Sequence, residues 1–158
     1  MRYITYAEFS ALYADAMTLT EFDLFEYDAE TILDNWVLTV DGVNKLRVAF
    51  PTNRADAEAV KRCICALAMA CKDINDADKQ SISEHGILAS VSSGTESMSF
   101  ARGGTSLAKA VADEQYRAQY YGNIVRRYLA GTRDANGVNL LYGGAYPVAI
   151  KGGEVNVC

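Results

Sequence analysis

The amino-acid sequence predicts a mainly α (α+β) protein: a small bundle of about four helices with one β-hairpin and an extended C-terminal arm. Apolar residues recur at intervals of three and four through most of the chain, as in amphipathic helices. Over residues 86–102 they alternate with polar residues, which is typical of a hairpin. Residues 139–158 are apolar, aromatic and glycine-rich, and follow neither period. We therefore divide the chain into a bundle, residues 1–138, and an arm, residues 139–158.

The composition is that of an ordinary globular domain. The 158-residue chain is 50% hydrophobic and 22% charged, and it is long enough to bury a substantial core. Its net charge of −5 argues against a broad basic face that binds nucleic acid. The sequence contains no apolar run of about 18 residues, so it predicts no membrane span. Its first residues lack the apolar core of a signal peptide, so we expect a protein made in a cytoplasm.

Two capping boxes open the first two predicted helices. Thr5 and Glu8 begin a short helix, and Thr18 and Glu21 begin a longer one that Gly42 terminates. The buried stripe of the longer helix, at 3-4-3-4 spacing, is predicted to consist of Phe22, Phe25, Ala29, Ile32 and Trp36. The carboxylates within residues 21–30 are expected on its polar face and need no catalytic role.

A long helix is predicted after Pro51. Thr52 or Asn53 can cap it, and it is expected to run to about Ile74. Its buried stripe is predicted to consist of Val60, Ile64, Leu67, Cys71 and Ile74.

The cysteines on this helix are expected to be reduced core residues. Cys63 and Cys71 share a face but lie roughly 12 Å apart along the helix axis, which is beyond disulfide reach. With one histidine, His85, and no CxxC pair, the sequence does not offer the four convergent ligands of a zinc site.

The predicted hairpin, residues 86–102, turns at Ser93-Gly94-Thr95. One face is rich in serine. The other is apolar and includes Ile87, Val91, Met98 and Phe100. Because an isolated two-stranded hairpin is barely stable in water, we expect it to pack on the helices or on another chain.

The last predicted helix runs from about Ser106 to Leu129, and Gly131 terminates it. Asp113 and Arg117 are spaced for an i,i+4 ion pair on its exposed side. Gly122 in its middle costs about 1 kcal/mol relative to alanine. Its neighbours in the sequence do not explain it, and close approach of another backbone is one candidate reason.

No catalytic constellation can be assembled from these residues. His85 has no flanking nucleophile motif, and residues 102–106 lack the spacing and the lysine of a P-loop. The acidic run at residues 73–78 lacks one oxygen ligand and the glycine of a calcium-binding loop. We therefore expect no catalytic, cofactor-binding or metal-binding residue, and no enzyme.

The sequence RRYLAGT, residues 126–132, leads to NLLYGG, residues 139–144. With the order of helices, these motifs resemble the head-tail connector (adaptor) proteins of long-tailed bacteriophages and prophages, over most of the chain up to Gly144. In that family a small helical bundle carries a β-hairpin, and a Tyr-Leu-x-x-Thr segment precedes a Leu-Leu-Tyr-Arg-Gly-like tail. This chain departs from the pattern at Gly143, where many relatives have arginine, and in the longer connection at residues 133–139.

The resemblance implies a structural virion protein of the phage neck, made in the bacterial host cytoplasm. Such proteins form rings, commonly dodecameric, beneath the portal protein, and a head-closure or tail-completion protein binds the opposite face. The ring continues the DNA channel without specific DNA binding, which fits the net charge of −5. We expect an isolated protein that is monomeric or weakly associated and that forms its ring on the portal.

Roles are predicted for two sets of residues, the first from the resemblance and the second from the hairpin itself. The arm would bind the portal through apolar anchors, namely Leu140, Leu141, Tyr142, Tyr146 and Val148. Because a two-stranded unit with serines on one face needs a neighbour, we expect the hairpin to line an inter-subunit or lumen-facing surface through Ile87, Val91, Met98 and Phe100.

Two alternatives stay open at this point. The arm can instead fold back over its own bundle, so that its removal uncovers core surface. The chain can also be a non-virion helical adaptor or regulator whose C-terminal peptide binds a partner.

Overall fold

The computed structural model describes residues 2–88 and 105–147, with the side chains of residues 2–81 and 107–147. Within these ranges the protein is mainly α, and its main helices pack together as the sequence predicts. These ranges contain no β-strand, only two isolated antiparallel bridges, which pair Leu38 with Asn44 and Arg133 with Asn139. None of the helices described is long and apolar enough to cross a membrane.

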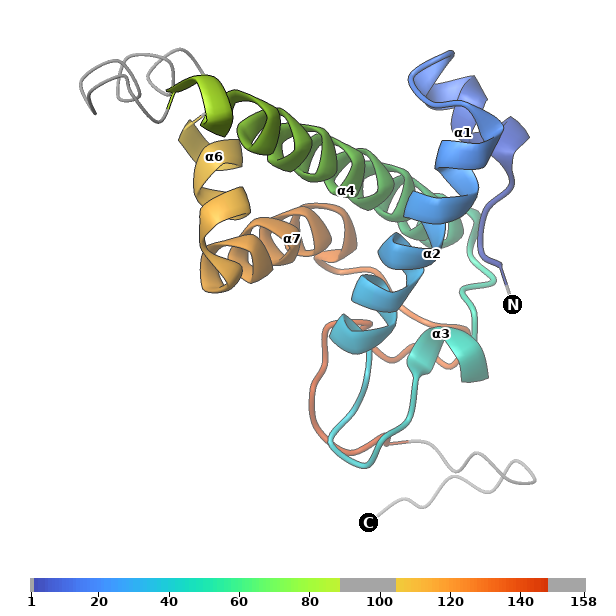
Figure 1. Ribbon diagram of the computed structural model, residues 1–158. Coiled ribbons are helices and arrows are strands. Elements are labelled where there is room, and N and C mark those ends of the chain that lie inside the picture. Colours follow the sequence, from blue (N-terminus) through green and yellow to red (C-terminus); the bar gives the residue numbers. More distant parts are fainter. Residues whose placement is uncertain (1, 89–104, 148–158) are drawn as a thin grey trace.

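The elements follow one another along the chain as α1 (Tyr6–Tyr13), α2 (Leu19–Trp36), α3 (Lys45–Val48), α4 (Arg54–Leu88), α6 (Thr105–Ala112) and α7 (Glu114–Leu129). The long helix α4 forms one side of the molecule, and α2 and α7 both pack against it (Figure 1). Helix α6 lies near the C-terminal end of α4 and leads into α7. The short helix α3 lies at the opposite end, together with the segment that follows α7.

Both predicted capping boxes are present. Thr5 Oγ1 accepts from the Glu8 amide at 3.3 Å, and Glu8 Oε2 accepts from the Thr5 amide at 2.8 Å. Thr18 and Glu21 make the same reciprocal pair at 3.3 and 2.8 Å. The starts of α1 and α2 are therefore confirmed, and each cap satisfies two amides that a helix terminus would otherwise leave unpaired.

Helix α4 begins where predicted, because Asn53 Oδ1 accepts from the Ala55 amide at 2.9 Å. Its predicted stripe is buried in full, at Val60, Ile64, Leu67, Cys71 and Ile74. The three cysteines on this helix are free thiols in the core. Burial raises the pKa of Cys63 to about 12 and that of Cys65 to about 11, so both stay protonated and unreactive at neutral pH.

The predicted end of this helix near Ile74 is wrong, because α4 continues to Leu88. Residues 75–85 contain no proline, and adding a residue to an existing helix costs far less than starting a new element. Helix α6 also packs on α4. The hairpin prediction is consequently wrong for residues 86–88, which are helical, and its remainder at residues 89–102 lies outside the described residues.

Asp113 divides the predicted last helix into α6 and α7. Its carboxylate caps α7 by accepting from the amides of Gln115 at 2.8 Å and Tyr116 at 3.3 Å. The Arg117 guanidinium donates to two carbonyl oxygens at the end of α6, at 2.7 and 2.9 Å. The two side chains expected to pair with each other instead satisfy backbone groups at the break.

Trp36 explains the glycine in the middle of α7. A Cβ atom added to Gly122 would lie 2.5 Å from Trp36 Cζ2, so the indole ring packs directly on the α7 backbone. The sequence suggested an approaching backbone, whereas the structure has an aromatic side chain. On the solvent side, the Arg126 guanidinium lies 4.9 Å from the centre of the same ring.

The hydrophobic core lies where α1, α2, α4 and α7 meet. Phe9 and Phe22 are fully buried there, with their ring centres 5.2 Å apart. One core residue, Leu140, comes from beyond the last helix and is also fully buried. The segment after α7 is therefore part of the fold.

Candidate partner-binding site

Residues 139–147 fold back onto the bundle, which corrects the predicted extended arm over that range. Gly131 and Gly137 turn the chain with φ angles of 83° and 82°, in the left-handed region that favours glycine. The Leu140 amide then donates to the Thr132 carbonyl at 2.9 Å, and the Leu140 side chain enters the core. Burying a leucine contributes about 1.5–3 kcal/mol relative to leaving it exposed. A free arm would forgo that contribution, which favours the folded-back alternative for these residues.

The folded-back segment lies beside the turn at residues 38–44, at the α3 end of the molecule (Figure 1). The Val40 amide donates to the Gly143 carbonyl at 3.2 Å, and the Tyr146 amide donates to the Asp41 carboxylate at 3.3 Å. The buried Lys45 ammonium donates to the Tyr142 carbonyl. These contacts join two parts of the chain that are about a hundred positions apart.

Buried polar groups hold this region in place. Asp134 Oδ1 accepts from the amides of Asn136 at 2.9 Å and Val138 at 2.8 Å, and Asp134 Oδ2 accepts from the Tyr146 hydroxyl. Burial, and then the hydrogen bond to Asp134, raise the pKa of Tyr146. Burial lowers the pKa of Lys45, whereas the negative charges of Asp134 and Asp41 raise it.

The predicted portal anchors occupy very different positions. Leu140 and Tyr146 are buried, and Leu141 packs partly buried against the core. Tyr142 is exposed. Val148 lies outside the described residues, so among the anchors described here only Tyr142 is available to a partner.

Two exposed apolar residues that sequence reasoning missed lie in the turn that is hydrogen-bonded to the segment of Tyr142. Leu38 and Val40 are also exposed, and the hydrogen bond between Val40 and Gly143 joins their turn to the segment that carries Tyr142. We call Leu38, Val40 and Tyr142 the end patch. The alternation of Leu38 and Val40 with polar residues was the available signal, but the sequence alone does not place their turn beside the segment that carries Tyr142.

The predicted hairpin residues are not brought together within the described chain. Ile87 lies in the last turns of α4. Val91, Met98 and Phe100 lie outside the described residues. Their expected inter-subunit or lumen-facing role therefore stays a prediction.

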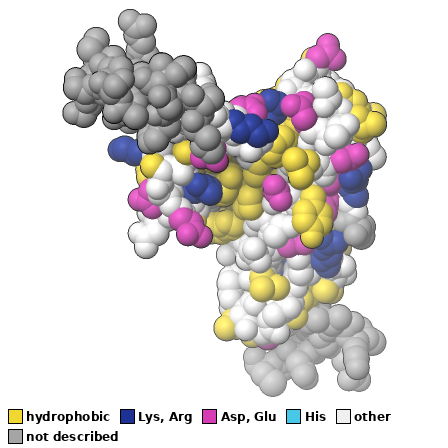
Figure 2. Space-filling view, viewed as in Figure 1, with side chains coloured by type: hydrophobic (Ala, Val, Ile, Leu, Met, Phe, Trp, Pro, Cys, Tyr) yellow, Lys and Arg dark blue, Asp and Glu magenta, His cyan; other side chains and the backbone are white. Residues whose placement is uncertain are grey.

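A cleft of about 500 Å³ opens between α2, α4 and α7. Apolar lining comes from Phe25, Ile32, Cys71, Ile74 and Tyr121, and polar groups from Asp28, Asp78 and Arg117. Figure 2 shows hydrophobic side chains at the centre of this face, with acidic and basic side chains around them. Burial raises the pKa of Cys71 to about 11, so the thiol in the cleft wall is protonated at neutral pH.

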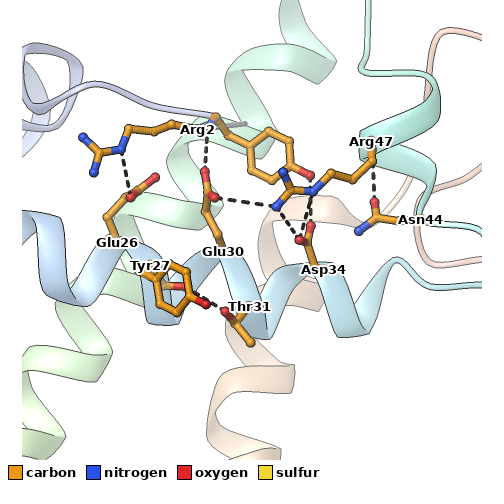
Figure 3. Close-up of polar contacts among 9 residues, drawn as sticks. Arg2, Glu26, Tyr27, Glu30, Thr31, Asp34, Asn44 and Arg47 are labelled. Atoms are coloured by element: carbon orange, nitrogen blue, oxygen red, sulfur yellow. Dashed lines mark hydrogen bonds and ion pairs between the residues drawn. The ribbon is translucent and has the colours of Figure 1, made fainter.

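Not all the acidic residues of α2 lie on its polar face, where the sequence predicts them. Glu26 and Glu30 are buried, while Asp23 and Asp28 are exposed. Figure 3 shows Glu26, Glu30 and Asp34 in one row along α2, pointing toward the N-terminal segment and Arg47. The sequence did contain a sign of this burial. The three residues are spaced four apart and lie next to the apolar stripe, which places them at the edge of the buried face.

The described side chains include no group of three or more His, Cys, Asp or Glu residues placed to hold a metal ion. No protein-family model matches the chain, and neither a curated protein nor a solved structure matches it.

Proposed function

We propose that this protein is a structural component of a phage neck, which connects the portal vertex of the capsid to the tail or to the next neck protein. The observation that carries the proposal is the Tyr-Leu-x-x-Thr motif at the end of the last helix, followed by the Leu-Leu-Tyr motif at residues 140–142. A helical bundle in which α7 ends at Leu129, inside the first motif, is the architecture expected of such a connector. In this role the protein is an assembly component and has no catalytic activity.

The folded-back segment changes which residues are proposed to meet the portal. Leu140 and Tyr146 contribute to the protein's own stability, because both are buried. We assign portal contact to the end patch and to the residues that follow Pro147, including Val148. Each buried Leu, Val or Tyr side chain would contribute roughly 1.5–3 kcal/mol before the cost of ordering is subtracted.

In a ring, a small contact of this kind on each subunit is sufficient for binding to the portal. When several copies bind one portal, each bound subunit raises the effective concentration of the next contact. A homo-oligomeric ring, dodecameric as is common in the family, would therefore assemble on the portal from weakly associating subunits. Its other face would receive the head-closure or tail-completion protein, and DNA would pass through without specific binding.

The alternative is a non-virion helical adaptor or regulator. The cleft between α2, α4 and α7 favours it, because an apolar lining with a few polar groups can accommodate a partner's side chains. The position of the gene separates the two functions. A connector gene is expected between genes for the portal or capsid and genes for tail completion.

The direct experiment is co-sedimentation of the full chain with assembled portal rings of the same phage. We expect the full chain to sediment with the rings, and the double variant Val40→Ser, Tyr142→Ser to bind about tenfold more weakly. The control is Leu12→Ser, which changes an apolar residue on α1 that is about as exposed as Tyr142. Failure of the full chain to bind contradicts the connector function. Equal binding by the double variant contradicts only the assignment of the end patch.

A chain that ends at Pro147 isolates the contribution of the remaining residues. It keeps every contact described above, so its melting temperature reports whether the bundle is intact. Reduced portal binding at an unchanged melting temperature would assign contact to the residues after Pro147. Unchanged binding would leave the end patch as the portal-binding surface.

A further inference from the structure

Two buried carboxyl groups lie one helical turn apart on α2. Glu26 is 2% exposed and Glu30 is 8% exposed. At i,i+4 spacing their side chains are neighbours on one face of the helix. Two negative charges that are buried at this separation repel each other and lose their hydration. Nearby positive charges or hydrogen-bond donors must offset both costs.

The compensation available to Glu26 is incomplete. Its Oε2 atom lies 3.2 Å from Arg2 Nε, but the Arg2 side chain is 49% exposed and also pairs with Asp23 at 2.9 Å. The other oxygen, Oε1, is buried without a hydrogen-bond partner. A buried, unpartnered carboxylate oxygen is costly, and a half-solvated arginine offsets only part of that cost.

Glu30 is better compensated, although its arginine is shared. Its Oε1 atom accepts from the Tyr3 amide at 2.6 Å. Its Oε2 atom lies 3.7 Å from Arg47 Nη2, which is closer to Asp34, at 2.6 Å (Figure 3). Along this side of α2, four carboxyl groups therefore face two guanidinium groups, those of Arg2 and Arg47. The carboxyl groups are those of Asp23, Glu26, Glu30 and Asp34.

A single proton resolves this arrangement. If Glu26 is protonated, its Oε1 atom becomes a donor that can bond to Glu30, and the repulsion between the two groups is removed. The pKa of Glu26 also favours the protonated form. Burial raises the pKa of Glu26 to about 7, helped by the hydrogen bond and the charge of Glu30, while Arg2 lowers it.

We propose that Glu26 holds a proton beside Glu30, and that its release to solvent loosens the N-terminal segment, residues 2–5, from α2. Both carboxyl groups hold that segment directly, Glu26 through Arg2 and Glu30 through the Tyr3 amide. When both are ionised, their repulsion acts on the contacts that hold the segment. The buried side chains of Tyr3 and Ile4 remain as its apolar attachment. This inference does not rest on the proposed function.

The direction of the pH effect follows from the sign of the shift. The folded protein keeps a proton at pH values where an unfolded glutamate, with its pKa near 4.5, has lost it. The stability that this proton contributes is therefore fully present below the unfolded value, falls as pH rises toward about 7, and is lost above that. Within this window, one retained proton changes the unfolding equilibrium constant by up to about tenfold per pH unit.

The test is urea unfolding of the full chain between about pH 5 and pH 8. We expect the wild type to become easier to unfold as pH rises, and Glu26→Gln to lose most of that slope. Glu58→Gln is the matched control, because it makes the same change at an exposed position of α4. We expect it to keep the wild-type slope. An unchanged slope in Glu26→Gln overturns the proposal.

Two measurements on the wild-type protein decide the question even if Glu26→Gln does not fold. The carboxyl carbon resonance of Glu26 should titrate near pH 7, and a midpoint near 4.5 overturns the proposal that Glu26 holds a proton. The Tyr3 amide donates a hydrogen bond to Glu30. When Glu26 ionises, hydrogen exchange of this amide should accelerate by more than the tenfold per pH unit that base catalysis alone produces. Exchange that rises only by that factor overturns the loosening of the N-terminal segment.

Discussion

The two non-helical ends of the described chain are attached to the bundle by different means. Residues 139–147 insert Leu140 into the core, and buried charges of opposite sign, Lys45 and Asp134, lie in the same region. Residues 2–5 also bury apolar side chains, but their polar contacts are to carboxyl groups of α2, where acids outnumber arginines. We expect attachment through an apolar side chain and hydrogen bonds to have little dependence on pH near neutrality. Attachment through neighbouring acids makes stability depend on a proton.

The largest expected effect breaks the C-terminal attachment. Leu140→Ala leaves a cavity in the core, and we expect a loss of about 2–5 kcal/mol in the free energy of unfolding. In a domain of this size each kcal/mol lowers the melting temperature by about 2–4 °C. Thermal unfolding at two pH values checks both this loss and its independence of pH.

The control for this variant is Tyr142→Ala, which changes an exposed residue in the same segment. We expect it to alter stability by no more than about 0.5 kcal/mol. Equal losses in the two variants would mean that Leu140 does not anchor the segment in the core.

An intermediate effect is expected from the polar contacts of the same segment. Asp134→Ala leaves the buried Val138 amide without its acceptor, which should cost about 1–3 kcal/mol. Tyr146→Phe removes the hydrogen bond to Asp134 and the acceptor of the Asn136 side chain, but it leaves the Val138 amide paired and should cost less, about 1 kcal/mol. Chemical denaturation of both variants measures which one loses more free energy of unfolding. A larger loss in Tyr146→Phe would show that Asp134 does not organise the turn.

The smallest effect concerns the N-terminal attachment. Tyr3→Phe removes the hydrogen bond from the Tyr3 hydroxyl to Asp34, at 2.9 Å, while the ring can still stack on Phe50. We expect a loss of about 0.5–1.5 kcal/mol. Burial, followed by the Asp34 hydrogen bond, raises the pKa of Tyr3, so denaturation near pH 8 measures the neutral phenol.

Tyr27→Phe is the matched control for that change, because Tyr27 is exposed on the same helix as Asp34. It should leave stability unchanged. If both variants lose the same stability, the Tyr3 hydroxyl makes no specific contribution to holding residues 2–5.

The sequence by itself determined the features that depend on residues within about four positions of one another. The reciprocal caps at Thr5–Glu8 and Thr18–Glu21 are of this kind, since each needs only one helical turn to form. The buried stripe from Val60 to Ile74 is another, because the helical period places those side chains on one face whatever lies against them.

Only the tertiary structure decided features that depend on a distant partner. Gly122 is explained by Trp36, and the Lys45 ammonium reaches the Tyr142 carbonyl across 97 positions. The sequence could not tell whether residues 139–147 leave the bundle, because Leu140 is equally apolar in a free arm and in a core. Nor could it show that Glu26 and Glu30 are buried. A carboxylate at the edge of a helix face is solvated or enclosed according to what packs beside it, and here the N-terminal segment encloses it.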